Sequence, residues 1–136
     1  MTTLTLIRGL PGSGKSTLGK MLVMNRHCWN DSACQFEADQ YFMTDEGEYA
    51  FDASKLHQAH ESCKAQVRLH LESGHDAIVS NTFTTMKEMK PYIDMAQELG
   101  AQLNVIECKG QFGNVHNVPA ETIDKMRQRW QDFKPL

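Results

Sequence analysis

The segment Gly9–Ser16, which reads GLPGSGKS, constrains the fold of this chain more than any other feature, because it matches the pattern G-x-x-x-x-G-K-[ST] in full. The apolar run Leu4–Ile7 precedes it, and Thr17–Met24, whose apolar residues recur with helical spacing, follows it. Its glycines let the backbone come close to an anion, and the N–H groups at the start of the following helix point toward that anion. The pattern predicts a phosphate-binding loop between a strand and a helix, with a nucleoside triphosphate as its ligand.

The residues of this loop have separate predicted roles. Lys15 reaches the β- and γ-phosphates of the nucleotide, and the Ser16 hydroxyl holds Mg²⁺. The predicted nucleotide-binding residues are Gly9, Leu10, Pro11, Gly12, Ser13, Gly14, Lys15, Ser16 and Thr17. The flanking strand and helix patterns argue against the alternative, a glycine-rich turn that merely lies beside a lysine.

Length and composition bound the remaining possibilities. With 136 residues the chain is predicted to form a single domain, residues 1–136, around one sheet. The formal net charge is −3, so no global basic field attracts nucleic acid, and nucleic-acid binding would depend on a local patch. The four cysteines form no C-x-x-C pair, which favours reduced thiols. A strand pattern begins directly after the first residues and no apolar stretch has the length of a membrane span, so the sequence predicts a soluble cytoplasmic protein with no membrane partner. The oligomeric state stays open.

Short apolar runs alternate with segments of helical period, as in βαβ units. The predicted strands are Leu4–Arg8, Cys34–Ala38, Asp76–Ser80 and Leu103–Cys108. Such runs suit strands that are covered on both faces. The sequence therefore predicts an α/β chain with the three-layer P-loop NTPase fold, in which helices flank a short parallel sheet of about four strands.

Start and stop signals mark three further helices. The first is capped by Asp52 and runs to Ser73; the second opens with the capping box Thr85–Glu88 and closes at Leu99–Gly100; the third begins at Pro119. Pro91 indicates either a kinked entry to the second helix or a second start there. In the third helix, Ile123, Met126 and Trp130 are predicted to share one stripe.

Asp39, at the predicted end of the second strand, is the candidate catalytic base. The irregular stretches Tyr41–Ala50 and Lys109–Val118 follow the second and fourth strands, where open α/β sheets build their sites. A carboxylate there can accept the proton of a substrate hydroxyl that attacks the γ-phosphate. The alternative role for Asp39 is to cap the next helix or turn. Glu37 is a weaker candidate, interpreted as solvated or ion-paired.

The third predicted strand ends in Ser80-Asn81-Thr82, where many P-loop proteins place an aspartate in the Mg²⁺ shell. These residues can hold a metal-bound water or simply form a turn. The absence of a carboxylate pair argues against efficient activation of water. Two other features favour ordinary structural roles: His57, His60 and Cys63 are interpreted as a half-buried helix face, and Arg8 as the partner of a nearby carboxylate.

The phosphate loop, Asp39 and the Asn81 turn together make the chain resemble small P-loop kinases of the phage polynucleotide 5′-kinase group, often labelled AAA family ATPase. The segments that carry this resemblance are Arg8–Thr17, Ala38–Phe42, Tyr49–Asp52, Asn81–Thr82, Met89–Tyr92, Asn114–Pro119 and Met126–Trp130. The resemblance implies ATP and Mg²⁺ as cofactors, Asp39 and Lys15 as catalytic residues, and a hydroxyl-bearing acceptor such as a nucleoside, a nucleotide or a nucleic-acid 5′ end. The chain also lacks the Asn-Lys-x-Asp guanine motif, which favours ATP over GTP.

Three positions depart from that family pattern. No arginine occurs in Gln40–Met43 or in Lys109–Val118, and Asn81 replaces an aspartate found in some members. Two alternatives therefore stay open beside the polynucleotide-type kinase. One is a small-molecule kinase of the zeta-toxin type, and the other is a nucleotide-binding regulatory module without efficient turnover.

Overall fold

A computed structural model describes residues 2–25, 35–112 and 118–134 of the chain. The elements, in which η marks a 3-10 helix, are β1 (Thr3–Arg8), α1 (Lys15–Asn25), β2 (Gln35–Phe36), η2 (Ala38–Phe42), η3 (Ala53–Lys55), α2 (Leu56–Glu72), β3 (Ala77–Asn81), α3 (Met86–Leu99), β4 (Gln102–Glu107) and α4 (Ala120–Gln128). No helix within these ranges is both long and apolar enough to cross a membrane.

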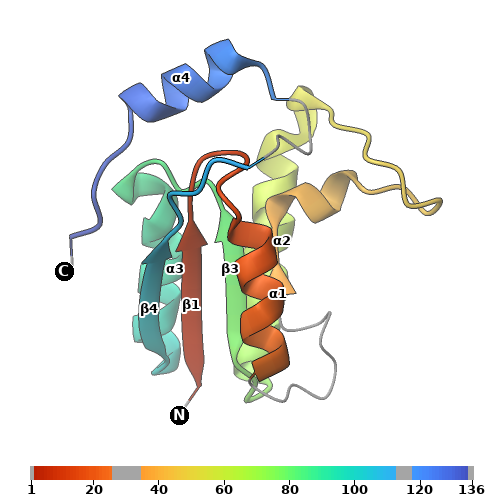
Figure 1. Cartoon of the computed structure of the whole chain (residues 1–136). Helices are drawn as coiled ribbons and strands as arrows, with labels where there is room; N and C mark the ends of the chain where they lie inside the picture. Colours follow the sequence, from red (N-terminus) through yellow and green to blue (C-terminus); the bar gives the residue numbers. More distant parts are fainter. Residues whose placement is uncertain (1, 26–34, 113–117, 135–136) are drawn as a thin grey trace.

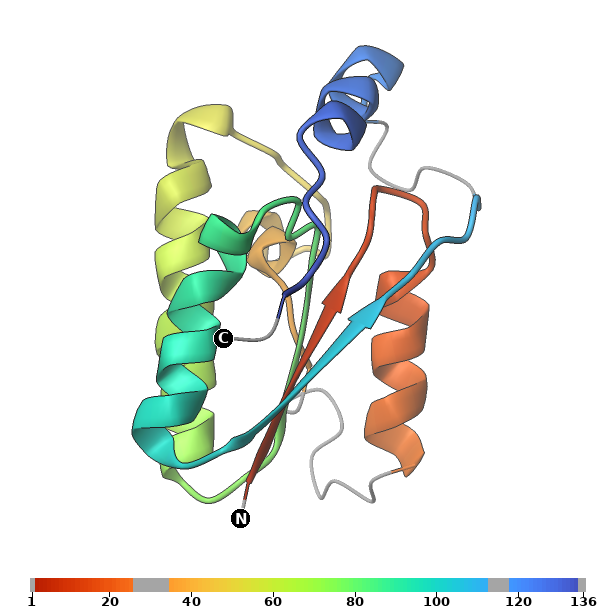
Figure 2. The same ribbon diagram turned by 90° about the vertical axis from the view of Figure 1, so that its left-hand side faces the viewer.

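The sheet has four parallel strands in the order β2-β3-β1-β4. Helix α1 covers one face, whereas α2 and α3 cover the other (Figures 1 and 2). The predicted three-layer α/β fold is thereby confirmed. Because β1 pairs in register with both β3 and β4, Arg8 lies opposite Asn81 and Glu107 at the carboxyl edge of the sheet. Helix α4 lies beyond this edge (Figure 1).

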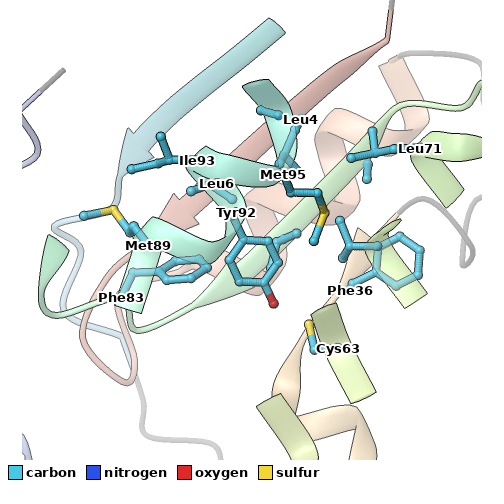
Figure 3. Packing of buried hydrophobic residues seen from close by; sticks show 14 residues of the cluster. Leu4, Leu6, Phe36, Cys63, Leu71, Phe83, Met89, Tyr92, Ile93 and Met95 are labelled. Atoms are coloured by element: carbon cyan, nitrogen blue, oxygen red, sulfur yellow. The ribbon is translucent and has the colours of Figure 1, made fainter. Parts of the chain in front are cut away.

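Alternate residues of β1 face the two layers of helices. Leu4 and Leu6 belong to the main core between the sheet, α2 and α3, which Figure 3 shows from close by. Ile7 belongs to a smaller core beneath α1, together with Val23 and Ile78. The sheet is thus buried from both sides at its centre, which gives the loop after β1 a rigid base.

Helix α3 follows its local sequence signals. The Thr85 hydroxyl accepts a hydrogen bond from the Glu88 N–H, and the Glu88 carboxylate accepts one from the Thr85 N–H, so the predicted capping box forms. Gly100 ends the helix in a left-handed conformation with φ +69°. The helix runs through Pro91 without a break, so the alternative of a second start there is wrong.

The second strand is shorter than predicted. The ladder with β3 covers only Gln35–Phe36, and the chain turns into η2 at Ala38. The side-chain oxygen of Asn81 accepts a hydrogen bond from the Ala38 N–H at 2.9 Å, which draws the chain out of the ladder. Asp39 therefore lies in a 3-10 helix and not at a strand end, and Cys34, the predicted first strand residue, lies outside the described residues.

Two helix predictions also need correction. Asp52 caps the 3-10 helix η3, and the regular helix α2 begins only at Leu56. Helix α4 ends at Gln128, so Trp130 does not continue its stripe. The Trp130 ring packs instead on the Arg8 guanidinium, 4.0 Å from it, because the chain folds back onto the sheet edge after α4.

Candidate nucleotide-binding and catalytic site

The phosphate loop joins the end of β1 to the start of α1, as the sequence predicts. Gly12 and Gly14 have φ values of +81° and +92°, which residues with a side chain rarely adopt. A Cβ at Gly9 would lie 2.2 Å from the Ser13 Oγ, so the loop closes tightly only around glycine. The predicted nucleotide-binding residues all lie in this loop or in the first turn of α1; they are Gly9, Leu10, Pro11, Gly12, Ser13, Gly14, Lys15, Ser16 and Thr17.

Phe112 lies against the phosphate loop, which the sequence did not indicate. Its N–H donates a hydrogen bond to the Gly12 carbonyl at 2.7 Å, and a Cβ at Gly14 would lie 3.0 Å from its ring. The ring is 72% exposed despite this contact. The sequence shows an aromatic residue after the fourth predicted strand, but no local pattern indicates that this residue contacts the phosphate loop.

Lys15 and Ser16 meet the segment that follows β2. Burial lowers the pKa of Lys15, while the negative charges of Glu37 and Asp39 act in the opposite direction. The Ser16 hydroxyl donates a hydrogen bond to the Glu37 carboxylate. Glu37 is half-buried and therefore not simply solvated, and its charge acts on Lys15 while its carboxylate contacts the loop residue predicted to hold Mg²⁺.

Asp39 is held by a residue of the loop that follows η2. The Tyr49 hydroxyl donates a hydrogen bond to the Asp39 carboxylate at 3.2 Å. Partial burial and the adjacent carboxylate raise the pKa of Tyr49 to about 12. Asp39 lies inside η2, whose N-cap is Glu37, so it does not have the capping role considered as an alternative.

The end of β3 connects the phosphate loop to η2. The Thr82 carbonyl accepts a hydrogen bond from the Gly9 N–H at 3.3 Å, and the Asn81 side chain accepts one from the Ala38 N–H. The loop, β3 and η2 therefore form one continuous edge. Within the described ranges, His, Cys, Asp and Glu side chains form no group of three that could hold a metal. On α2, His57 and His60 are exposed and Cys63 is buried.

A cavity of about 290 Å³ lies beside this edge, between the N-terminal halves of α2 and α3. Its lining residues are His57, His60, Glu61, Lys64, Asn81, Thr82, Phe83, Lys87, Glu88, Pro91 and Tyr92. Partial burial lowers the pKa of His60, whereas Glu88 and Asp39 act to raise it. Asp39 is thus close enough to the cavity to act electrostatically on a lining residue.

The buried Arg8 side chain joins the sheet edge to the segment after α4. It is 1% exposed and donates hydrogen bonds to the carbonyls of Phe83 at 2.7 Å and Gln131 at 2.6 Å. The Gln131 N–H in turn donates to the Thr84 carbonyl at 2.7 Å. Among the described residues no carboxylate accepts a hydrogen bond from Arg8, so the predicted carboxylate pairing is wrong.

A parallel α/β sheet with this glycine loop at its carboxyl edge defines a P-loop domain. The chain belongs to the AAA domain family AAA_33, whose model matches residues 4–113. The matched range includes the phosphate loop, Glu37, Asp39 and the cavity.

Two relatives are similar in sequence over nearly all of this chain. Human NEDD4-binding protein 2 is 32% identical over 140 residues, which cover 96% of this chain and 8% of that protein. The uncharacterized protein PM0531 of Pasteurella multocida is 30% identical over 135 residues, which cover 93% of this chain and 75% of that protein. The chain thus spans only a small part of the human relative.

Solved structures share the fold at low sequence identity. Chaetomium thermophilum Kti12 in complex with ADP-AlF3 has a TM-score of 0.66 at 14% identity, over 95% of this chain and 80% of that one. The Pnkp1/Rnl/Hen1 complex has a TM-score of 0.64 at 18% identity, over 91% of this chain and 38% of the matched chain. Mycobacterium tuberculosis APS kinase CysC in complex with AMPPNP and APS has a TM-score of 0.57 at 15% identity, over 91% of this chain and 67% of that one. Neighbours of the fold therefore include kinases.

Proposed function

We propose that this chain is an ATP-dependent kinase that transfers the γ-phosphate to a hydroxyl of a nucleoside, a nucleotide or a nucleic-acid 5′ end. The observation that carries the proposal is a complete phosphate loop between β1 and α1, with the segment that contains Asp39 joined to it by the hydrogen bond from Ser16 to Glu37. The nucleotide analogues bound to the Kti12 and APS kinase structures support a nucleotide at this loop. The polynucleotide-kinase resemblance and the Pnkp1 neighbour favour the acceptor class.

In this proposal each residue has a defined task. The loop N–H groups and Lys15 bind the triphosphate and offset its charge. The Asp39 carboxylate takes the proton of the acceptor hydroxyl as its oxygen bonds to the γ-phosphorus, and the bond to the β–γ bridging oxygen breaks to release ADP. The Ser16 hydroxyl is an oxygen ligand of the kind that Mg²⁺ prefers, and Mg²⁺ held there would neutralise charge on the phosphates.

The cavity between α2 and α3 is the proposed place for the acceptor. Asn81 and Thr82 lie in its lining and also contact η2 and the phosphate loop, so an acceptor there stands beside the nucleotide. Lys64 and Lys87 are balanced by Glu61 and Glu88 in the same lining. Because these charges cancel, we expect the cavity to accept a polar acceptor and not to require that the acceptor be negatively charged.

An acceptor panel tests the proposal directly. Radiolabelled ATP is incubated with 5′-hydroxyl oligonucleotides, nucleosides and nucleotide sugars, with Lys15→Ala as the inactive control. We expect label on a nucleoside, nucleotide or oligonucleotide hydroxyl. Label on a nucleotide sugar alone would favour the small-molecule kinase of the zeta-toxin type.

The second candidate is a nucleotide-binding regulatory module. The observation that favours it is Asn81 at the end of β3, since an amide there supplies no carboxylate to hold the Mg²⁺ that would offset the charge of the transferred phosphate. This module predicts tight ATP binding with no label on any acceptor and no hydrolysis. Calorimetry and the acceptor panel on one preparation separate the two candidates.

A further inference from the structure

β3 ends in Asn81, at a place where a carboxylate could hold a nucleotide-bound cation. The Asn81 amide instead takes part in hydrogen bonds within the protein. The Asn81 Oδ1 accepts the Ala38 N–H at 2.9 Å, and the Nδ2 faces the Cys63 Sγ at 4.0 Å. Asn81 is 8% exposed, so its side chain is enclosed by these contacts. Any protein carboxylate that holds the cation would therefore come from another element of the site.

Glu37 is the carboxylate that contacts Ser16. Gln35 and Glu37 are two residues apart along β2 and its extension, so their side chains leave the chain on the same side. The Gln35 Nε2 donates to the Ser16 carbonyl at 3.2 Å, and the Glu37 carboxylate accepts from the Ser16 hydroxyl. Two neighbouring side chains thus hold one end of α1, and the acidic one reaches the hydroxyl expected to hold the cation.

We propose that Glu37 supplies the protein carboxylate of the Mg²⁺ site formed with Ser16 and the phosphates of the bound nucleotide. The proposal rests on the nucleotide binding set out above and adds a metal residue to it. Mg²⁺ in phosphate sites is held by one or two carboxylates, substrate phosphates and waters, and a hydroxyl–carboxylate pair beside a phosphate loop matches that set. A carboxylate that holds a metal-bound water serves this purpose as well as a direct ligand.

A simpler role for Glu37 is to balance the charge of Lys15. Glu37 does act on the pKa of Lys15, and so does Asp39. The two roles predict a different dependence of ATP binding on Mg²⁺ when Glu37 is replaced. Loss of a mere counter-ion frees Lys15 for the phosphates with or without Mg²⁺, whereas loss of a metal carboxylate removes the benefit of Mg²⁺ alone.

The test compares Glu37→Gln with the wild type and with Glu48→Gln, which removes the same charge from an exposed residue of the following loop. Calorimetry measures ATP affinity in EDTA and in Mg²⁺, and electron paramagnetic resonance measures Mn²⁺ binding to the protein–ATP complex. For Glu37→Gln we expect ATP affinity in EDTA equal to or above that of the wild type, and a Mn²⁺ Kd raised about 10- to 100-fold. Glu48→Gln is expected to match the wild type in both measurements.

Wild-type Mn²⁺ affinity in folded Glu37→Gln would overturn the inference while Mg²⁺-dependent ATP binding by the wild type still supported the proposed function. A wild type that binds no nucleotide would overturn both. If Glu37→Gln does not fold, Glu37→Asp keeps the charge and draws the carboxylate back by one methylene. A raised Mn²⁺ Kd in Glu37→Asp is then the expected result, and an unchanged one overturns the inference.

Discussion

The carboxylates of Glu37 and Asp39 both act on the pKa of Lys15, but they form hydrogen bonds with different partners. Glu37 bonds to the Ser16 hydroxyl on the phosphate loop, and Asp39 bonds to the Tyr49 hydroxyl on the side of the loop after η2. In the proposed function, Glu37 serves the nucleotide and Asp39 serves the acceptor. Their substitutions should have separable effects on binding and on chemistry.

Asp39→Asn should reduce phosphoryl transfer by about 10²-fold or more while ATP affinity stays within a few-fold. The amide keeps the shape of the side chain and cannot take the acceptor proton. Steady-state kinetics with the acceptor found in the panel, together with calorimetry, measure both quantities. Asp45→Asn, an exposed carboxylate in the following turn, is the matched control. Undiminished transfer would remove Asp39 as the base, and lost ATP binding would place it in the nucleotide site.

Tyr49→Phe should flatten the loss of stability at alkaline pH. The pKa of Tyr49 is raised to about 12 by partial burial and by Asp39, against an ordinary value of about 10. The folded state therefore holds this proton more tightly than the unfolded state. Its stabilising effect is complete below about pH 10 and is lost as the pH rises to about 12. Denaturant unfolding between pH 9 and 12 measures the slope, and equal slopes for variant and wild type would contradict the assignment.

The segment after α4 is the element whose placement depends most on a single side chain. Arg8, at the end of β1, donates a hydrogen bond to the Gln131 carbonyl of this segment, and its guanidinium stacks on the Trp130 ring. Arg129 adds a hydrogen bond from its Nε to the Thr84 hydroxyl at 3.0 Å. These contacts hold the chain that leaves α4 across the carboxyl edge of the sheet (Figure 2).

Arg8→Met should lower the free energy of unfolding by about 2–4 kcal/mol, because it leaves two carbonyl oxygens without their donor. Limited proteolysis should then cut first within 129–133. Arg68→Met is the matched control, since Arg68 pairs with Glu98 at the surface of α2 and such pairs contribute about 0–1 kcal/mol. A stable Arg8→Met with wild-type proteolysis would show that the packing of Phe133 on the core suffices.

The proposed nucleotide site is assembled by the whole molecule, because its parts come from the end of β1, the start of α1, η2 and the end of β3. A ligand that binds this assembly binds only the folded state. Ligand binding and global stability are therefore linked by mass action.

Saturation with MgATP should raise the melting temperature. At 100 times Kd the gain is about 2.7 kcal/mol, on the order of 10 °C for a domain of this size. Chelation of the metal should remove much of this shift, and Lys15→Ala should abolish it with the fold intact. Lys90→Ala, which breaks an exposed pair with Asp94 on α3, should respond like the wild type. A shift with GTP and none with ATP would contradict the expected base preference.

Features that depend on neighbouring residues could be predicted from the sequence alone. The phosphate loop, the capping box of α3 and four short strands all follow from local backbone preferences and periodicity, and each forms within a few residues of its predicted bounds. Contacts between distant segments were decided by the tertiary structure. Ser16 and Glu37 are 21 residues apart, and Arg8 and Gln131 are 123 apart. These pairs meet because the strands adopt the order β2-β3-β1-β4 and the chain after α4 returns to the sheet edge, neither of which is encoded in any local pattern.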